Sequence, residues 1–173
     1  MDTYRKRRSW SDQFLETVQR IVGEHLIEPS PTEYDVERAS DLTVMRAKPV
    51  HVAVRVRRHR YLQKYGDEIT IRNKVLNGYD SEFEKMKCGF ADMMFYGFAA
   101  KNGPPEIAKW ALLDLDLFRR QLMSKRGLNR LCTGVKNNRD GTALRWFKID
   151  SLRNDVIIAQ ADDTDTAQED LLF

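Results

Sequence analysis

Hydrophobic positions near the start of the chain recur at helical spacing. Apolar residues from Phe14 to Leu26 fall on one side of a helix, behind Ser11, a residue type that caps helices, and Pro29 ends the run. Trp10 lies just ahead of this cap, where a hydrophobic residue can pack against the first turns. The pattern therefore predicts an amphipathic helix that buries one face.

The next segments alternate between apolar and polar residues, which is typical of strands. We expect a hairpin in which residues 41–47 pair with residues 50–61 around a turn at Pro49, followed by a short strand at residues 67–74. Because side chains alternate along a strand, the valines of the second strand share one face. The opposite face carries His51, Ala53, Arg55, Arg57 and His59.

The rest of the pattern predicts a helix, two buried strands, a second helix and a last strand. They are expected at residues 80–88, 89–99, 106–116, 115–125 and 142–149. The second of these segments is so apolar that a buried helix is the competing interpretation. Asp80 or Ser81 would cap the first helix, and Asp114 and Asp116 would end a strand and cap the second helix. This order predicts an α/β or α+β fold with a central mixed sheet flanked by helices.

Charged residues are distributed unevenly along the 173 residues. Residues 1–154 hold all 29 Lys and Arg but only 20 of the 26 Asp and Glu, which leaves about nine excess positive charges. We expect one globular domain there, with a short basic arm at its start. Residues 155–173 hold six acids and no basic residue, and are expected to form an acidic flexible tail. A basic body favours a polyanionic partner, nucleic acid first.

Composition disfavours several other classes of protein. No apolar run approaches the roughly 18 residues of a membrane-spanning helix, and no secretory signal is recognised, so a soluble cytoplasmic protein without a membrane partner is expected. Cys88 and Cys132 are too far apart for a Cys-based zinc site and favour a reducing compartment. Neither GxGxxG nor GxxxxGK(S/T), the glycine-rich motifs of nucleotide-binding proteins, occurs, which disfavours nucleotide enzymes. No histidine lies near a cysteine in the sequence, which disfavours Cys–His hydrolases.

The last six residues, QEDLLF, end the acidic segment with apolar side chains. Gln168, Leu171, Leu172 and Phe173 stand where an extended peptide can place one polar and several apolar anchors in neighbouring pockets. This hexapeptide resembles the motif with which bacterial DNA-metabolism proteins bind the sliding clamp. The resemblance implies the sliding clamp as a partner, bound with about micromolar affinity, or −8 kcal/mol. Two alternatives are that the tail folds back onto the domain or acts as a degradation signal.

The densest run of basic residues lies at the end of the second predicted strand. Its members are Arg55, Arg57, Arg58 and Arg60. Guanidinium groups grip phosphates through paired hydrogen bonds, so these four are predicted to bind DNA. In the alternative interpretation they solvate the sheet and pair with acids such as Asp67 and Glu68.

The order of elements, with Asp41 at the start of a strand, also resembles the core of the PD-(D/E)XK (restriction-endonuclease-like) nucleases. In that family an Asp and a following acid-x-Lys hold Mg²⁺ and orient water. The resemblance implies Asp41 as metal ligand and catalytic residue, with Mg²⁺ as cofactor if the protein is an enzyme. The next strand departs from the pattern, because Arg55-Val56-Arg57 lacks the acid.

A second catalytic acid would therefore come from elsewhere, with Glu84 and Asp92 as candidates. Asp92 lies within an apolar run, where an unpaired carboxylate is costly. Its alternative role is that of a structural acid paired with an arginine or a backbone donor. Glu37, Glu68 and Glu82 could also supply the acid.

Three functions are compatible with these features. The first is a metal-dependent DNA nuclease guided by the sliding clamp, and the second is a non-catalytic DNA-binding protein of replication or repair with the same tail. The third is a phage or plasmid interaction protein that captures or inhibits a host replication or defence factor.

Overall fold

The computed structural model describes residues 9–24, 27–29, 42–44, 50–75, 80–89, 91–124 and 127–162. Asp41 and the C-terminal hexapeptide, on which the nuclease and clamp predictions depend, lie outside these ranges.

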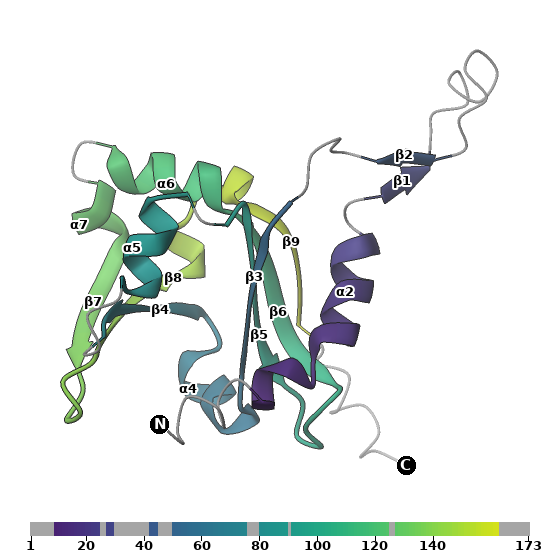
Figure 1. The fold of residues 1–173 in the computed structure, drawn as a ribbon, viewed down its shortest axis with the longest axis horizontal. Helices are drawn as coiled ribbons and strands as arrows, with labels where there is room; N and C mark the ends of the chain where they lie inside the picture. The colour runs from purple at the N-terminus through teal and green to yellow at the C-terminus, as the bar shows by residue number, and fades with distance from the viewer. Residues whose placement is uncertain are drawn as a thin grey trace.

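The larger sheet has four strands in the order β3-β5-β6-β9 (Figure 1). Its strands are β3 (Val52–Arg57), β5 (Met93–Ala99), β6 (Ile107–Asp114) and β9 (Ile157–Asp162). β3 and β5 run parallel, whereas β5–β6 and β6–β9 pair antiparallel, so the sheet is mixed. Lys109 on β6 fixes the end of β9, because its Nζ lies 2.7 Å from Asp162 Oδ2 and 3.0 Å from Asp67 Oδ1.

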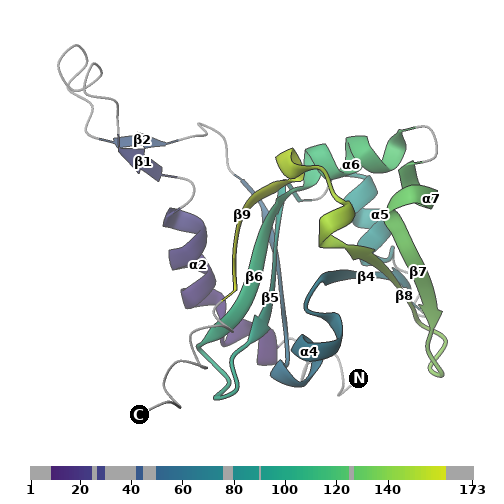
Figure 2. The same cartoon turned by 180° about the vertical axis from the view of Figure 1, so that it is seen from behind.

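A second sheet of three antiparallel strands, in the order β4-β8-β7, lies beside the first. Its strands are β4 (Glu68–Lys74), β7 (Cys132–Asn137) and β8 (Ala143–Lys148). A short antiparallel pair, β1 (Ile27–Pro29) with β2 (Leu42–Val44), stands away from both sheets at the end of α2 (Figure 2). The single central sheet expected from the sequence is therefore divided in two, while the mixed α/β class is confirmed.

The helices cover the sheets from different sides (Figures 1 and 2). α2 (Leu15–Glu24) lies on the outer face of the four-stranded sheet, whereas α5, α6 and α7 gather over the inner side of the three-stranded sheet. These three helices are α5 (Glu82–Lys87), α6 (Leu115–Met123) and α7 (Gly127–Leu131). Short helical turns complete the described chain: a turn at residues 9–12 ahead of α2, η1 (His59–Tyr61), α4 (Leu62–Tyr65), η2 (Ile149–Ser151) and η3 (Asn154–Val156).

Two hydrophobic clusters result, one on each face of the four-stranded sheet. Phe14, Val18 and Ile21 pack with Val56 and Phe95 in the outer cluster. The inner cluster lies between the two sheets and the helices α5 and α6, and includes Tyr96, Phe98, Phe118 and Phe147. β5 contributes alternate residues to both clusters, which explains why the run of residues 93–99 is apolar without a polar face.

Local predictions from the sequence are confirmed at several points. Trp10 packs edge-on against Phe14, with ring centroids 5.4 Å apart. Ser81 caps α5 by accepting a hydrogen bond from the backbone N–H of Glu84, and Asp114 caps α6 in the same way. Each predicted helix and buried strand between residues 80 and 149 is present, with bounds shifted by a few residues.

The pairing of strands was predicted wrongly. β2 and β3 do not form a hairpin, because β2 pairs with β1 and β3 pairs in parallel with β5. The alternation in β3 indicates which face is buried, but it carries no information on the neighbouring strand. The strand β7 was not predicted, and the expected flexible tail is wrong for residues 157–162, which form β9 against β6.

Among the described residues, no helix is long and apolar enough to cross a membrane.

Candidate nucleic-acid interface

Basic and aromatic side chains gather where β3 ends and the chain turns through η1 and α4. We call this surface the basic–aromatic ridge. It consists of Arg57, Arg58, Arg60, Tyr61, Lys64 and Tyr65. Leu62, which lies between Tyr61 and Lys64 in the chain, is buried in the inner cluster and anchors the ridge. Gly66 ends α4 close to Leu62, so close that a Cβ there would lie 2.7 Å from the Leu62 carbonyl oxygen.

Arg57 lies at the base of the ridge and is held by aromatic rings. Its guanidinium carbon is 4.6 Å from the ring centroid of Tyr61 and 5.2 Å from that of Tyr65. Its Nη1 lies 3.4 Å from the hydroxyl oxygen of Tyr96, to which it donates. Because aromatic faces attract a cation without neutralising it, Arg57 keeps its positive charge in a half-buried place.

The outer cations of the ridge are exposed and lie against aromatic rings. Arg58 stands 4.3 Å from the Trp10 ring centroid, and Arg60 stands 5.0 Å from that of Tyr61. Lys64 lies 5.4 Å from the centroid of Tyr65. In the part of the chain that the structure describes, none of these three cations forms an ion pair with an acid. The ridge therefore combines fixed positive charge with aromatic surface.

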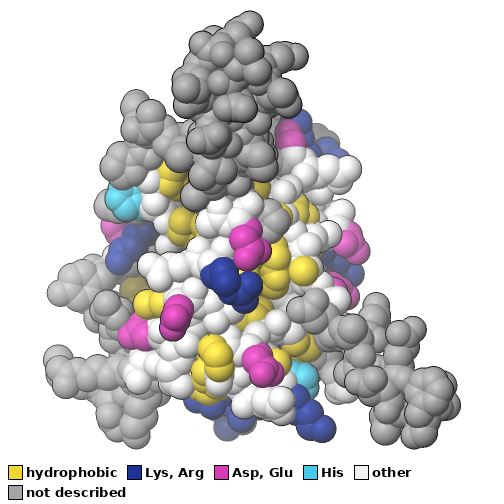
Figure 3. Space-filling view, turned by 90° about the vertical axis from the view of Figure 1, so that its right-hand side faces the viewer, with side chains coloured by type: hydrophobic (Ala, Val, Ile, Leu, Met, Phe, Trp, Pro, Cys, Tyr) yellow, Lys and Arg dark blue, Asp and Glu magenta, His cyan; other side chains and the backbone are white. Residues whose placement is uncertain are grey.

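The side of the molecule that α2 covers differs from the ridge. Figure 3 looks onto the side of α2, where single basic side chains stand beside acidic ones and hydrophobic side chains show between them. Arg20 and Glu24 on α2, for example, pair at 3.4 Å. The described part of this face offers no comparable basic surface.

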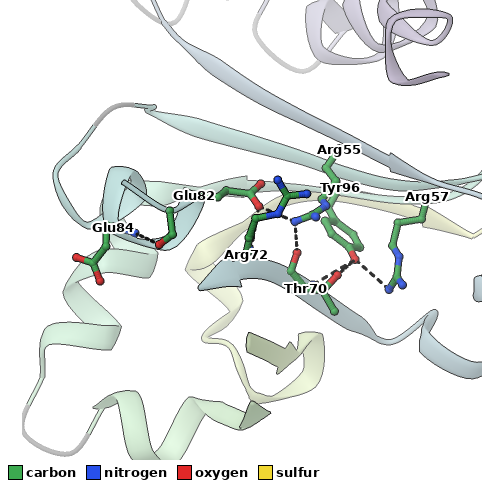
Figure 4. A network of polar contacts seen from close by, with 8 residues as sticks. Arg55, Arg57, Thr70, Arg72, Glu82, Glu84 and Tyr96 are labelled. Carbon is green, nitrogen blue, oxygen red and sulfur yellow. Dashed lines mark hydrogen bonds and ion pairs between the residues drawn. The ribbon is translucent and has the colours of Figure 1, made fainter. Parts of the chain in front are cut away.

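Arg55 shares the strand face of Arg57 but has a different environment (Figure 4). Its Nη1 donates to the carbonyl oxygen of Thr70 at 2.6 Å and to Glu82 Oε2 at 2.7 Å. The Arg55 side chain is only 23% exposed. In contrast to the expectation from the sequence, Arg55 does not offer a free charge, and its predicted role in DNA binding stays a prediction.

The same network closes the free edge of β4. The backbone N–H of Thr70 donates to the Tyr96 hydroxyl oxygen at 3.2 Å, and the N–H of Arg72 donates to Glu82 Oε2 at 3.0 Å. Arg55 satisfies the Thr70 carbonyl on this edge. Side chains from β3, β5 and α5 thus replace a neighbouring strand, and they hold the second sheet against the first (Figure 4).

The carboxylates predicted as catalytic have other partners. Glu84 pairs with Lys87 on the surface of α5, with 2.8 Å between Oε2 and Nζ. Asp92 Oδ2 accepts a hydrogen bond from the backbone N–H of His51 at 2.8 Å, and the Asp92 N–H donates back to the His51 carbonyl oxygen at 2.9 Å. Asp92 therefore joins the starts of β3 and β5, which agrees with the structural alternative, although it is partly exposed.

These acids do not fit a magnesium site. No group of three or more His, Cys, Asp or Glu side chains that could hold a metal ion occurs within the described residues. Asp41, the one residue that matches the nuclease pattern, lies outside them. We therefore derive no metal-dependent step.

The arginines of the ridge were predicted from the sequence as a binding surface, but its aromatic residues were not. Tyr61 and Tyr65 alternate with basic residues between positions 57 and 65, and this interleaving is a signal that could have been used. Trp10 could not have been placed there, because it comes from a segment about fifty residues earlier.

Comparison with known proteins found no matching family model, no matching curated protein and no matching solved structure. The likenesses to the clamp-binding peptide and to the restriction-endonuclease-like core consequently stay predictions.

Proposed function

We propose that this protein binds DNA through the basic–aromatic ridge and docks on a sliding clamp through its C-terminal hexapeptide. The observation that carries the first part is the set of three exposed cations, Arg58, Arg60 and Lys64, that lie on aromatic rings without an acidic partner among the described residues. Cations without partners on a rigid support are suited to phosphate groups, since no internal ion pair has to be broken first.

The salt dependence of DNA binding tests the ridge. If the three exposed cations each neutralise one phosphate of duplex DNA, the slope of log K against log salt is about −2.7. The double variant Arg58→Gln/Arg60→Gln should reduce that slope by about 1.8 and weaken binding to every sequence. Fluorescence anisotropy with labelled DNA at several salt concentrations measures both quantities.

A matched control removes two exposed charges elsewhere. Lys85 on α5 and Arg120 on α6 are exposed and have no ion pair within the described residues. The variant Lys85→Gln/Arg120→Gln changes the net charge equally and should leave the slope close to that of the unchanged protein. Equal effects of the two double variants would show that net charge, not the ridge, attracts DNA. A flat salt response would refute DNA binding and favour the interaction protein.

Binding to the clamp depends on residues 168–173, and their sequence supports this part of the proposal. A chain without these six residues should fail to retain a purified bacterial sliding clamp, and Leu171→Ala/Phe173→Ala should behave alike. Both variants should keep the melting temperature of the full chain, because docking peptides contribute to the partner complex and not to the core. A large fall in melting temperature would instead show that the tail packs on its own domain.

Cleavage of DNA decides between the accessory protein and the nuclease. We favour the accessory protein, because Glu84 and Asp92 have structural partners. Incubation of branched, duplex and single-stranded DNA with Mg²⁺ or Mn²⁺ should leave the strands intact. Cleavage that disappears in Asp41→Ala would overturn this choice and establish the enzyme.

A further inference from the structure

The three-stranded sheet has one covered face and one more open face. Phe147 on β8 is fully buried under α5 and α6, where its ring meets those of Phe83 and Phe118. The next residue back along the strand, Trp146, points to the opposite face because side chains alternate. Trp146 is only partly buried, although large aromatic side chains gain most from full burial. Part of its surface thus remains accessible to solvent.

The sequence of β7 makes room for the Trp146 ring. Gly134 is the register partner of Trp146, and a Cβ at this glycine would lie 2.9 Å from Trp146 Cε2 and closer still to Cζ2. Glycine weakens a strand and often marks a place where another group approaches closely. Here the approaching group is the indole ring, which lies against the β7 backbone and is thereby held in one position.

Three cations and one acid flank this ring on the same face. Lys148 is two residues further along β8, opposite Glu68 of β4, and Lys136 and Arg72 flank Leu144, two residues in the other direction. Lys136 and Lys148 are exposed, and none of these three cations forms an ion pair within the described residues. A fixed aromatic ring among free cations is the arrangement with which proteins hold unpaired nucleotides, since the base stacks and the phosphates contact the charges.

Buried polar contacts connect the base of the basic–aromatic ridge to the strand that pairs with Trp146. Arg57 of the ridge reaches the Tyr96 hydroxyl, and that hydroxyl lies 2.7 Å from Thr70 Oγ1. Thr70 is the register partner of Trp146 on β4, so the two residues are one strand spacing, about 4.8 Å, apart. Because Thr70 and Tyr96 are buried, these contacts fix the position of the Trp146 strand relative to the ridge and do not themselves contact a ligand.

We propose that Trp146 is a stacking platform for an unpaired base, and that the preferred ligand is single-stranded DNA or a single-stranded region next to a duplex. The inference rests on the proposed DNA binding and adds the class of strand. A base within a duplex has both faces covered by its neighbours, so only an unpaired base can stack on the ring.

Affinities for a labelled oligo(dT) strand and a labelled duplex test the inference. Trp146→Ala should weaken binding of oligo(dT) about tenfold and change duplex binding by less than about twofold. Val135→Ala, on the other face of β7, is the matched control and should change neither affinity. Equal losses on both ligands, or no loss on oligo(dT), would overturn the platform.

Trp146→Phe provides a second readout if the alanine variant does not fold. Stacking of thymine on the indole ring should quench the tryptophan fluorescence of the unchanged protein, and Trp146→Phe should remove this part of the quenching, leaving only the part that comes from Trp10 beside the ridge. Unchanged quenching would refute the inference. If the ridge variants weaken DNA binding but Trp146 variants do not, only the platform fails, whereas absence of binding to either ligand refutes the proposed function as well.

Discussion

Glu82 is predicted to be the residue on which the junction of the two sheets depends most. Its Oε2 atom accepts both from Arg55 Nη1 and from the Arg72 backbone N–H. Glu82→Ala removes both bonds and leaves Arg55 with its charge in a place where it is only 23% exposed. Breaking a fully buried ion pair from one side costs about 3–5 kcal/mol. Because the Glu82 side chain is 35% exposed, water can replace part of the loss, and we expect about 2 kcal/mol.

Thermal unfolding followed by circular dichroism measures this loss. For a chain of this length, about 2 kcal/mol corresponds to a fall in melting temperature of about 4–8 °C. Glu82→Gln keeps an acceptor for the Arg72 N–H and should lose less. Glu84→Ala is the matched control on the same helix. It breaks an ion pair between side chains that are 44% and 39% exposed, which should cost about 0.5 kcal/mol or less.

A double-mutant cycle isolates the interaction between Arg55 and Glu82. Arg55→Leu, Glu82→Leu and the combined variant should give a coupling energy of about 1–3 kcal/mol, because the two side chains share one charge-assisted hydrogen bond. Additive losses would refute the reasoning, since the charge of Arg55 would then not depend on Glu82. In that case Arg55 would again be a candidate for binding phosphate.

Two further variants test contacts that fix the ends of elements. Burial would lower the pKa of Lys109, but hydrogen bonds and charges from Asp162 and Asp67 outweigh it and raise the pKa above the ordinary 10.5. A pKa that is higher in the folded than in the unfolded state stabilises the fold fully at a pH below the unfolded-state pKa. This stabilisation is lost as the pH rises through the folded-state pKa. Lys109→Met should therefore destabilise the protein at neutral pH, and by a shrinking amount above about pH 10.5. Equal losses by urea unfolding at pH 7 and pH 11 would contradict this. Asp114→Ala removes the cap of α6 and should lower the free energy of unfolding by about 1 kcal/mol. Asp114→Asn keeps a capping oxygen and should retain most of the stability of the unchanged protein. Identical melting curves for the two variants would show that the cap does not contribute.

The elements could be predicted from the sequence where a local pattern determines them. Ser81 and Asp114 are caps that act within three residues, and the apolar run of β5 needs only to be recognised as covered on both faces. β9 shows how composition can mislead. Its residues alternate between partly buried and exposed along Ile157–Asp162, a strand pattern, but the acidic residues around it favoured a disordered tail.

Strand pairing and charge pairing could not be predicted, because both depend on residues far apart in the chain. β3 pairs with β5 across a crossover that contains β4 and α5, and no local signal specifies that partner. Arg55 and Glu82 are 27 residues apart, so the sequence could not show that one of the four clustered arginines is neutralised. The same holds for Trp146, whose importance becomes visible only when Gly134 is found opposite it.

The closed edge of β4 has a consequence for self-association. An open strand edge is a template on which a second chain can add a strand, and proteins protect such edges from aggregation. On β4 the side chains of Tyr96, Arg55 and Glu82 hydrogen-bond the backbone groups of this edge, so a second chain cannot pair with them. Within the described residues, the other edge of this sheet is β7, where Val135 is 45% exposed. Fibril growth or domain exchange through the three-stranded sheet would therefore proceed from β7.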